Sequence, residues 1–244
     1  MSNTSHMSSF ACTASRSSNV AGVAPSRPQQ LSSASGTRQQ RRREQTRARL
    51  IAAAKMLIAE RGVGSVGLSE ITEVADLGAG TFYNYFQSRD DIVEAVAEES
   101  VESLGAALDR LTADMPDAAE VFGYSLRHLV RQAITDPVWG WFVVRLGVAH
   151  PALIRILGPR AARDLRKGAE SGRFSIADID VATSCVFGAL LSTLHQVLST
   201  TVQPDIDSVF AQTMLCMVGI PADEAEDIAS RPLPALSFPA APST

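Results

Sequence analysis

Apolar and polar residues follow one another at helical spacing along most of the chain. Between residues 68 and 92, apolar residues first recur three and four positions apart, and Gly78 then breaks the pattern. After the break, Phe82 and Phe86 lie four residues apart and therefore share one face of a second helix. The pattern predicts two short helices joined by a tight turn, with both phenylalanine rings facing the protein interior.

Further helices are predicted on both sides of this pair. An apolar face over residues 50–58 predicts a preceding helix that ends at Gly62, because glycine is a common carboxy-terminal stop. No alternating strand pattern of useful length occurs in the sequence, so the predicted fold class is all-α. The later helices are predicted at about residues 92–111, 118–135, from 137 onward, 151–172 with an interruption at Gly158-Pro159, 177–200 and 205–218.

The loop at residues 62–67 spells GxGxxG, the spacing found in dinucleotide-binding turns. Such a turn follows a strand inside a βαβ unit, whereas a helix precedes this one. We therefore interpret it as a flexible connection between two helices, with Ser69 capping or beginning the second.

The two ends of the chain lack a helical pattern. Residues 1–43 are rich in Ser, Ala, Gln and Arg, and are predicted to be a disordered basic arm. Residues 221–244 are acidic and then proline-rich, and are predicted to be a flexible tail. Between them, residues 44–89 are predicted to form one helical domain and residues 90–220 a second.

Charge is distributed unevenly, although the formal net charge is only −4. Residues 1–49 hold eight arginines and one acidic residue, for a net charge of +7, and the remainder carries −11. The basic residues therefore lie next to the helix pair. The arm could contact a polyanion such as DNA, or it could be a solvated tail that supplies only non-specific attraction.

The outward residues of the second short helix suit a DNA major groove. They are Ala79, Gly80, Thr81, Tyr83, Asn84 and Tyr85. Apart from the tyrosine rings they are small and polar, and none is acidic, so they could approach base edges and phosphates.

The run ADLGAGTFYNYFQSRDDI, which begins at Ala75, is similar to the signature of the TetR family of bacterial transcriptional regulators. The positions that match are Gly80, Thr81, Tyr83, Phe86, Arg89 and the pair Asp90–Asp91. The resemblance extends from about Thr46 to Val96. Three positions depart from the family pattern: Asp76 stands where Gly is usual, Gly78 where a capping Ser or Thr is usual, and Ala79 where Lys is frequent.

The resemblance and the side-chain chemistry together assign roles in DNA binding. Thr81, Tyr83, Tyr85 and Arg89 are expected to contact phosphates by resemblance to the family. Thr46 could hold a phosphate because it lies at the start of the first helix, where backbone donors are free, and Arg47 and Ser69 are further candidate DNA-binding residues. Asn84 is expected to read a base, because its amide can pair with adenine, while Ala79 could touch a thymine methyl and Gly80 allows close approach. The alternatives are partial burial for each tyrosine and an ordinary surface ion pair for Arg89.

The resemblance also implies an unknown small-molecule effector and a homodimer. The candidate effector residues are Phe122, His128, Trp141, Phe142, Arg145 and His195, although each aromatic ring could equally be plain core and each histidine a surface or satisfied core residue. The predicted dimer forms through the last two helices, about residues 177–218, where small residues allow close helix approach. The alternative is an ordinary intramolecular core.

Other classes of protein receive little support from the sequence. No phosphate loop, nucleophile motif or metal-ligand spacing is present, so an enzyme, a cofactor and a metal site are not expected. No apolar run reaches the roughly 18 residues of a membrane span, and three unpatterned cysteines indicate a reducing cytoplasm, with Cys185 and Cys216 as small fillers. The predicted function is a ligand-responsive transcriptional regulator, with repression preferred, on a palindromic double-stranded operator. The alternative is a helical scaffold or co-regulator without operator binding.

Overall fold

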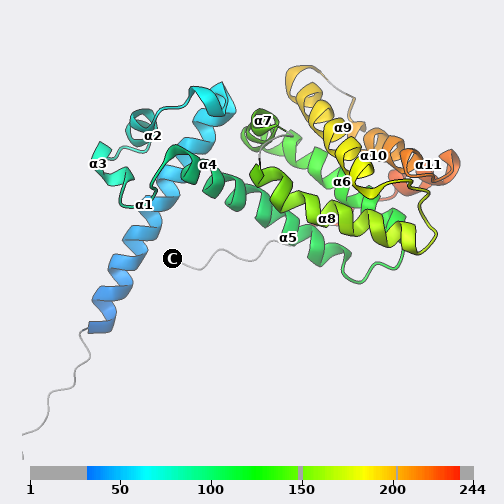
Figure 1. Ribbon diagram of the computed structural model, residues 1–244, viewed down its shortest axis with the longest axis horizontal. Coiled ribbons are helices and arrows are strands. Elements are labelled where there is room, and N and C mark those ends of the chain that lie inside the picture. The colour runs from blue at the N-terminus through cyan, green and yellow to red at the C-terminus, as the bar shows by residue number, and fades with distance from the viewer. Residues whose placement is uncertain (1–31, 148–150, 202, 237–244) are drawn as a thin grey trace, which may run out of the picture. The chain divides into compact units, whose positions relative to one another are not determined.

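The computed structural model describes residues 32–147, 151–201 and 203–236, and within these ranges the regular structure is entirely helical, as predicted (Figure 1). Residues 42–244 form one compact unit, and the part of the chain before Arg42 forms another, which is considered by itself. The helices are α1 (Ser32–Arg61), α2 (Leu68–Val74), α3 (Ala79–Phe82), α4 (Arg89–Ala97), α5 (Ser103–Thr112), α6 (Ala118–Thr135), α7 (Pro137–Leu146), α8 (Pro151–Glu170), α9 (Ile179–Ser199), α10 (Ile206–Met217) and α11 (Ala222–Ser230).

The first small core is built where α1, α2 and α3 meet. Leu50 and Ile58 of α1, Ile71 of α2 and Phe82 of α3 are each at most 1% exposed, and together they close this core. A short 3₁₀ turn, Val63–Ser65, connects α1 to α2. Glu70 stabilises the start of α2 by accepting a hydrogen bond from the Gly67 backbone N–H at 2.9 Å.

A second part of the same continuous hydrophobic core, called the second core, lies among α5 to α10. Phe142, Leu165, Leu194 and Leu215 are fully buried there, one each from α7, α8, α9 and α10. Asp207 of α10 is also fully buried, and its carboxylate accepts hydrogen bonds from Arg127 and Arg131 of α6, each at 3.0 Å. Because these arginines lie four residues apart, both reach one carboxylate and hold α10 along α6.

A π turn, Glu98–Glu102, joins α4 to α5 within one continuous helical segment. This segment begins at the small amino-terminal core and runs into the second core. A π turn contains one more residue in each hydrogen-bonded ring than an α-helix does, and such turns are frequent at functional sites. The sequence predicted the long helix here but gave no sign of the turn.

Four expectations differ from the structure. Residues 32–43 of the predicted disordered arm are helical as the start of α1, while residues 1–31 lie outside the described residues. The predicted flexible tail contains α11, which buries Ala225 and Ile228. The predicted interruption at Gly158-Pro159 is absent, because α8 continues through Pro159. Cys185 and Cys216 are exposed rather than packed inside, and Cys12 lies outside the described residues.

Helix α9 is long and apolar enough to cross a membrane by length and composition. This differs from the sequence analysis, which found no apolar run long enough for a membrane span. Only Val186, Leu190 and Leu194 of its 21 residues are buried. A single helix of this kind is weak support for a membrane span, since helices that pack in soluble proteins pass the same test.

Candidate functional site

The turn between α2 and α3 keeps a left-handed backbone at Asp76, whose φ is 51°. Among the described residues, Asp76 is the one non-glycine with a positive φ. Aspartate tolerates this conformation better than most residues. Arg49 of α1 donates to the Asp76 carbonyl oxygen at 3.1 Å, and its guanidinium also lies 3.4 Å from the Asp76 carboxylate. The tight turn is therefore retained, although Asp76 stands where the family usually has glycine.

Helix α3 is a single turn, and the chain continues in a turn through Tyr85; residues 79–86 together are called the α3 segment. Phe82 is 1% exposed and Phe86 is 5% exposed, with their ring centroids 5.7 Å apart. Both rings face the core, which confirms the prediction. Tyr83 is 66% exposed, and Asn84 is also exposed. The buried pair thus leaves a polar, aromatic-bearing surface available to solvent.

The other predicted DNA contacts have different surroundings. Ala79, Gly80 and Ser69 are exposed, whereas Thr81 and Arg89 are partly buried. Tyr85 is partly buried against the core, and the guanidinium carbon of Arg43 lies 5.8 Å from its ring centroid. The guanidinium carbon of Arg47 lies 5.4 Å from the Phe86 ring centroid. Two arginines of α1 are therefore placed beside the α3 segment by contacts with its aromatic rings.

Two of these residues have hydrogen bonds or ion pairs within the protein. The Thr46 hydroxyl donates to the Arg42 carbonyl oxygen at 2.9 Å, so its proton is already used inside α1. Arg89 lies 3.8 Å from the Asp90 carboxylate, which corresponds to the surface pair considered as an alternative. Both can still rotate toward a phosphate, because neither contact is buried.

Asp91 has a structural role at the start of α4. Its backbone N–H donates to the Ser88 hydroxyl oxygen at 3.1 Å, and its carboxylate accepts from the Gln87 N–H at 3.0 Å. This reciprocal arrangement resembles a capping box and fixes where α4 begins. This cap was not predicted, although a serine three residues before an acidic residue is a sequence signal for one.

A cavity of about 70 Å³ lies in the second core. Its apolar wall includes Leu108 of α5, Phe122 and Leu126 of α6, Leu157 of α8 and Leu190 of α9. This volume is far below the roughly 300–1,000 Å³ of drug-sized sites, so it favours a ligand no larger than one ring. Among the described residues, no group of three or more His, Cys, Asp and Glu side chains could hold a metal ion.

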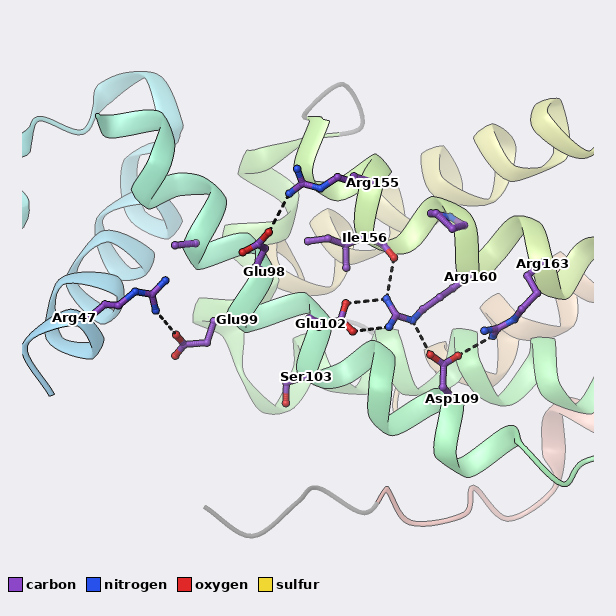
Figure 2. A pocket seen from close by; sticks show the side chains of 12 residues that line it. Arg47, Glu98, Glu99, Glu102, Ser103, Asp109, Arg155, Ile156, Arg160 and Arg163 are labelled. Carbon is purple, nitrogen blue, oxygen red and sulfur yellow. Dashed lines mark hydrogen bonds and ion pairs between the residues drawn. The ribbon is translucent and has the colours of Figure 1, made fainter. Parts of the chain in front are cut away.

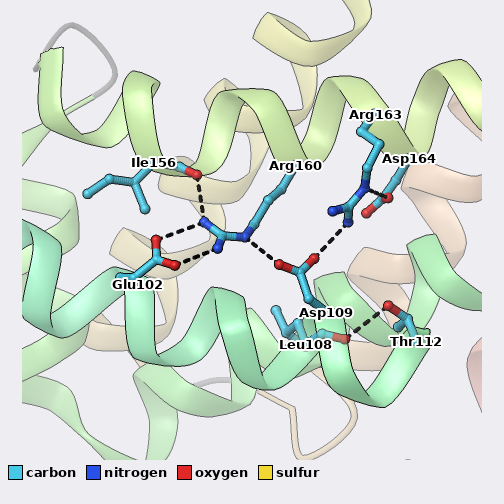
Figure 3. A network of polar contacts seen from close by, with 8 residues as sticks. All are labelled: Glu102, Leu108, Asp109, Thr112, Ile156, Arg160, Arg163 and Asp164. Carbon is cyan, nitrogen blue, oxygen red and sulfur yellow. Dashed lines mark hydrogen bonds and ion pairs between the residues drawn. The ribbon is translucent and has the colours of Figure 1, made fainter. Parts of the chain in front are cut away.

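One wall of the cavity is charged (Figure 3). Asp109 of α5 accepts hydrogen bonds from Arg160 and Arg163 of α8, both at 2.8 Å. Arg163 also donates to Asp164 at 2.8 Å. Burial alone would raise the pKa of the Asp109 carboxyl, but the two arginines outweigh it and hold that pKa below its ordinary value. The wall therefore combines ionised acceptors and donors at hydrogen-bonding distance from one another.

These four charged residues were missed by the sequence analysis, and of the predicted effector residues only Phe122 lines the cavity. Phe142 is fully buried in the core, and His128 is buried on α6. The Trp141 ring meets the exposed His195 edge-on with centroids 5.7 Å apart, and the exposed Arg145 lies 5.2 Å from the same ring centroid. A charge on an otherwise apolar helix face, as at Asp109, was the available signal.

An open groove borders the same charged wall (Figure 2). It has a volume of about 860 Å³ and shares Asp109, Arg160 and Arg163 with the smaller cavity, which is less open than the groove and is called the enclosed cavity. Its charged side chains form ion pairs with one another, as the dashed lines in Figure 2 mark. Because the enclosed cavity is largely apolar with a few converging polar groups, it is the better site for a small organic ligand.

Helices α9 and α10 expose small and apolar side chains. Cys185, Gly188 and Ser192 of α9 are exposed, and so are Val209 and Met217 of α10. Such a surface allows another helix to approach closely. Ala211, in contrast, is fully buried within the chain.

Two protein-family models match the chain. The one described as "Bacterial regulatory proteins, tetR family" matches residues 50–96, and the one described as "Tetracyclin repressor-like, C-terminal domain" matches residues 117–231. An uncharacterised HTH-type transcriptional regulator of Mycobacterium tuberculosis is 30% identical over 103 residues, which are 42% of this chain and 51% of that protein. The chain thus spans about half the length of the curated relatives it matches.

Solved structures extend the similarity over more of the chain. RolR in complex with resorcinol is 55% identical, with a TM-score of 0.66, and the match covers 81% of this chain and 99% of that one. RolR without ligand is 54% identical, with a TM-score of 0.64, and the match covers 78% of this chain and 100% of that one.

Proposed function

The chain belongs to the TetR family of bacterial transcriptional regulators, and on that premise we propose that it is a cytoplasmic repressor controlled by a small aromatic effector. It binds a palindromic double-stranded DNA operator as a homodimer. Binding of the effector in the enclosed cavity favours a second arrangement of the protein with lower operator affinity.

The observation that carries operator binding is the orientation of the α3 segment. Phe82 and Phe86 anchor it, and Tyr83 and Asn84 are left exposed. Asn84 offers an amide that reads adenine, while Tyr83 and Thr81 offer hydroxyls to phosphates. Arg43 and Arg47, beside the same segment, add the positive charge that DNA binding requires.

The charge balance of the cavity wall favours a neutral effector with hydroxyl groups. Each of Arg160 and Arg163 already has two carboxylate partners, so neither offers an uncompensated positive charge to an anion. A hydroxyl can donate to a carboxylate and accept from a guanidinium at once, and so it can join this network without changing its charge. The cavity volume and the apolar wall favour a single aromatic ring. Resorcinol, named as the ligand of the similar RolR structure, has this chemistry.

The exposed face of α9 and α10 supports the homodimer. Cys185 and Gly188 provide small side chains there, and Val181, Val209 and Met217 are each at least 40% exposed. A paired copy would bury these groups, and the apolar character of α9 then has an explanation that needs no membrane. Two-fold symmetry would also place two α3 segments on half-sites about 34–36 Å apart.

Fluorescence anisotropy tests the proposal with the full-length protein and labelled DNA from upstream of its own gene. We expect tighter binding than to a shuffled duplex, steep weakening with salt, and release by resorcinol. Equal affinity for both duplexes would instead favour the helical co-regulator without operator binding. Operator binding that resorcinol leaves unchanged would reject the proposed effector.

A further inference from the structure

The π turn that links α4 to α5 is held at both ends by α8. At its first residue, Glu98 lies 3.3 Å from Arg155, which also pairs with Glu94 of α4. At its last residue, Glu102 accepts two hydrogen bonds from Arg160, at 2.7 and 3.0 Å (Figures 2 and 3). The two arginines are five residues apart on α8. Helix α8 therefore clamps the turn across its whole length.

Only one of these two clamps reaches the enclosed cavity. Arg160 lines that cavity and Arg155 does not, although both line the open groove. The Arg160 guanidinium lies between two carboxylates of the α4–α5 segment, with Glu102 on one side and Asp109 on the other at 2.8 Å. Gly105 lies between them in sequence, and a Cβ there would come within 3.0 Å of the Arg160 guanidinium. The absence of a side chain at Gly105 therefore leaves room for the Arg160 guanidinium between the cavity and the π turn.

The segment on the other side of the turn leads to the proposed DNA-binding surface. Glu99 lies 3.9 Å from Arg47, whose guanidinium is placed over the Phe86 ring. Helix α4 packs Ile92 and Val96 into the buried core, and both are fully buried. A change in the turn would therefore be passed to the residues that support α3.

We propose that Glu102 is a positioning residue that couples the cavity to the DNA-binding domain, by holding Arg160 and the π turn together in the operator-binding arrangement. The proposal rests on the proposed function, because it assumes an effector in the cavity. A hydroxyl that accepts from Arg160 and donates to Asp109 competes with Glu102 for the same guanidinium. Once the Glu102 pair opens, the turn loses one of its two clamps on α8.

The consequence follows from helix geometry. If the released π turn becomes α-helical, the helix on one side rotates relative to the other by about one residue, roughly 100° with a rise of about 1.5 Å. Part of such a movement is enough to displace α3 from a groove, since register on DNA is fixed by several phosphate contacts at once. The effector then stabilises the released arrangement relative to the operator-binding one, by an amount set by the difference in its affinity for the two arrangements.

The test compares Glu102→Gln with Glu99→Gln in the full-length protein. Both substitutions remove one carboxylate from the same turn, but only Glu102 contacts Arg160. In Glu102→Gln the effector no longer has to displace a carboxylate. Calorimetric titration should therefore show resorcinol binding tighter by about three- to tenfold, and the resorcinol concentration that releases half of the operator DNA should fall by the same factor. Glu99→Gln should leave resorcinol affinity within about twofold of the original protein.

Hydrogen–deuterium exchange distinguishes coupling from simple stabilisation, because an ion pair that only stabilises the fold would not make amide exchange in the π turn respond to resorcinol. Resorcinol should speed amide exchange at residues 98–102 in the original protein, and Glu102→Gln should show the faster exchange without resorcinol. Unchanged or weaker resorcinol binding in Glu102→Gln, with exchange unaltered by ligand, would overturn the coupling role while the effector site stood. If resorcinol fails to bind the original protein, the proposed effector is wrong and the coupling proposal falls with it.

Discussion

The indole nitrogen of Trp139 donates a hydrogen bond to the carbonyl oxygen of Ser100 at 3.1 Å. Trp139 is 2% exposed and belongs to α7, whereas Ser100 is the middle residue of the π turn. Widening of a helical turn weakens its regular hydrogen bonding, so an outside donor helps to satisfy this carbonyl. The turn is therefore held by α7 through its backbone and by α8 through its side chains.

Replacing Trp139 with Phe should lower the free energy of unfolding by about 1–3 kcal/mol, because it removes a buried donor and leaves the carbonyl of Ser100 without it. Urea denaturation monitored by circular dichroism measures the change. Trp141→Phe is the matched control on the same helix, since its ring is only partly buried. Equal losses in the two variants would show that ring volume matters here and the hydrogen bond does not.

Replacing Asp76 with Gly should raise the free energy of unfolding by up to about 1 kcal/mol. Glycine adopts the φ of 51° without the steric penalty of a side chain, and the ion pair to Arg49 that is lost is exposed and weak. Asp76→Ala keeps the steric penalty of a positive φ and also loses the ion pair to Arg49. It should therefore be less stable than both the original protein and Asp76→Gly. A less stable Asp76→Gly protein would mean that the Arg49 contacts, and not backbone strain, determine the stability of this turn.

Stability should fall as the pH drops toward 5, and His128 should account for part of the loss. Burial lowers the pKa of His128 below its ordinary value of 6.5, against a hydrogen bond to the Pro234 backbone. Between the lowered pKa and 6.5 the unfolded chain therefore binds more protons than the folded one. The stabilisation is fully present above 6.5 and is lost as the pH falls.

His128→Asn keeps a side-chain donor and removes the titration. We expect the difference in unfolding free energy between pH 7.5 and pH 5.5, measured in urea, to be smaller in this variant than in the original protein. A pH dependence that is the same in the variant and the original protein would remove His128 from the explanation.

Asn84 and Tyr83 should differ in what they contribute to DNA binding. Asn84→Ala should change which sequences are preferred, because an amide reads base edges, at about 1–3 kcal/mol for one base pair. Tyr83→Phe should weaken all duplexes by a similar factor, because its hydroxyl is expected to contact a phosphate. Binding of each variant to a library of single-base changes in the upstream DNA measures both. A uniform loss in both variants would reject this division of roles.

The features of the fold that depend on local sequence were predictable. Gly62 and Asp136-Pro137 mark helix ends and starts by backbone chemistry alone, and the Phe82–Phe86 spacing identified the buried face of the α3 segment. Helix α11 was missed because its composition suggested a tail, although Ala225, Ile228 and Ala229 have helical spacing. The continuity of α8 through Pro159 is set by packing, which can override the preference of proline.

The candidate ligand site was largely unpredictable for a physical reason. Asp109 and its partners Arg160 and Arg163 are more than fifty residues apart in sequence, and only the packing of α5 against α8 brings them together. Aromatic residues such as Trp141 were attractive candidates by chemistry, but they lie away from the enclosed cavity. Local patterns locate faces and caps, whereas a pocket formed by four helices depends on contacts that no single pattern records.

The most direct test of the account measures resorcinol affinity twice by calorimetry, once with the free protein and once with the protein saturated by its upstream DNA. If effector binding in the cavity and DNA binding at the α3 segment are coupled, resorcinol should bind the DNA-saturated protein at least about fivefold more weakly. Operator affinity should fall by the same factor when resorcinol is saturating. Identical resorcinol affinities in the two titrations would contradict the account, because a ligand that binds both states equally cannot release DNA.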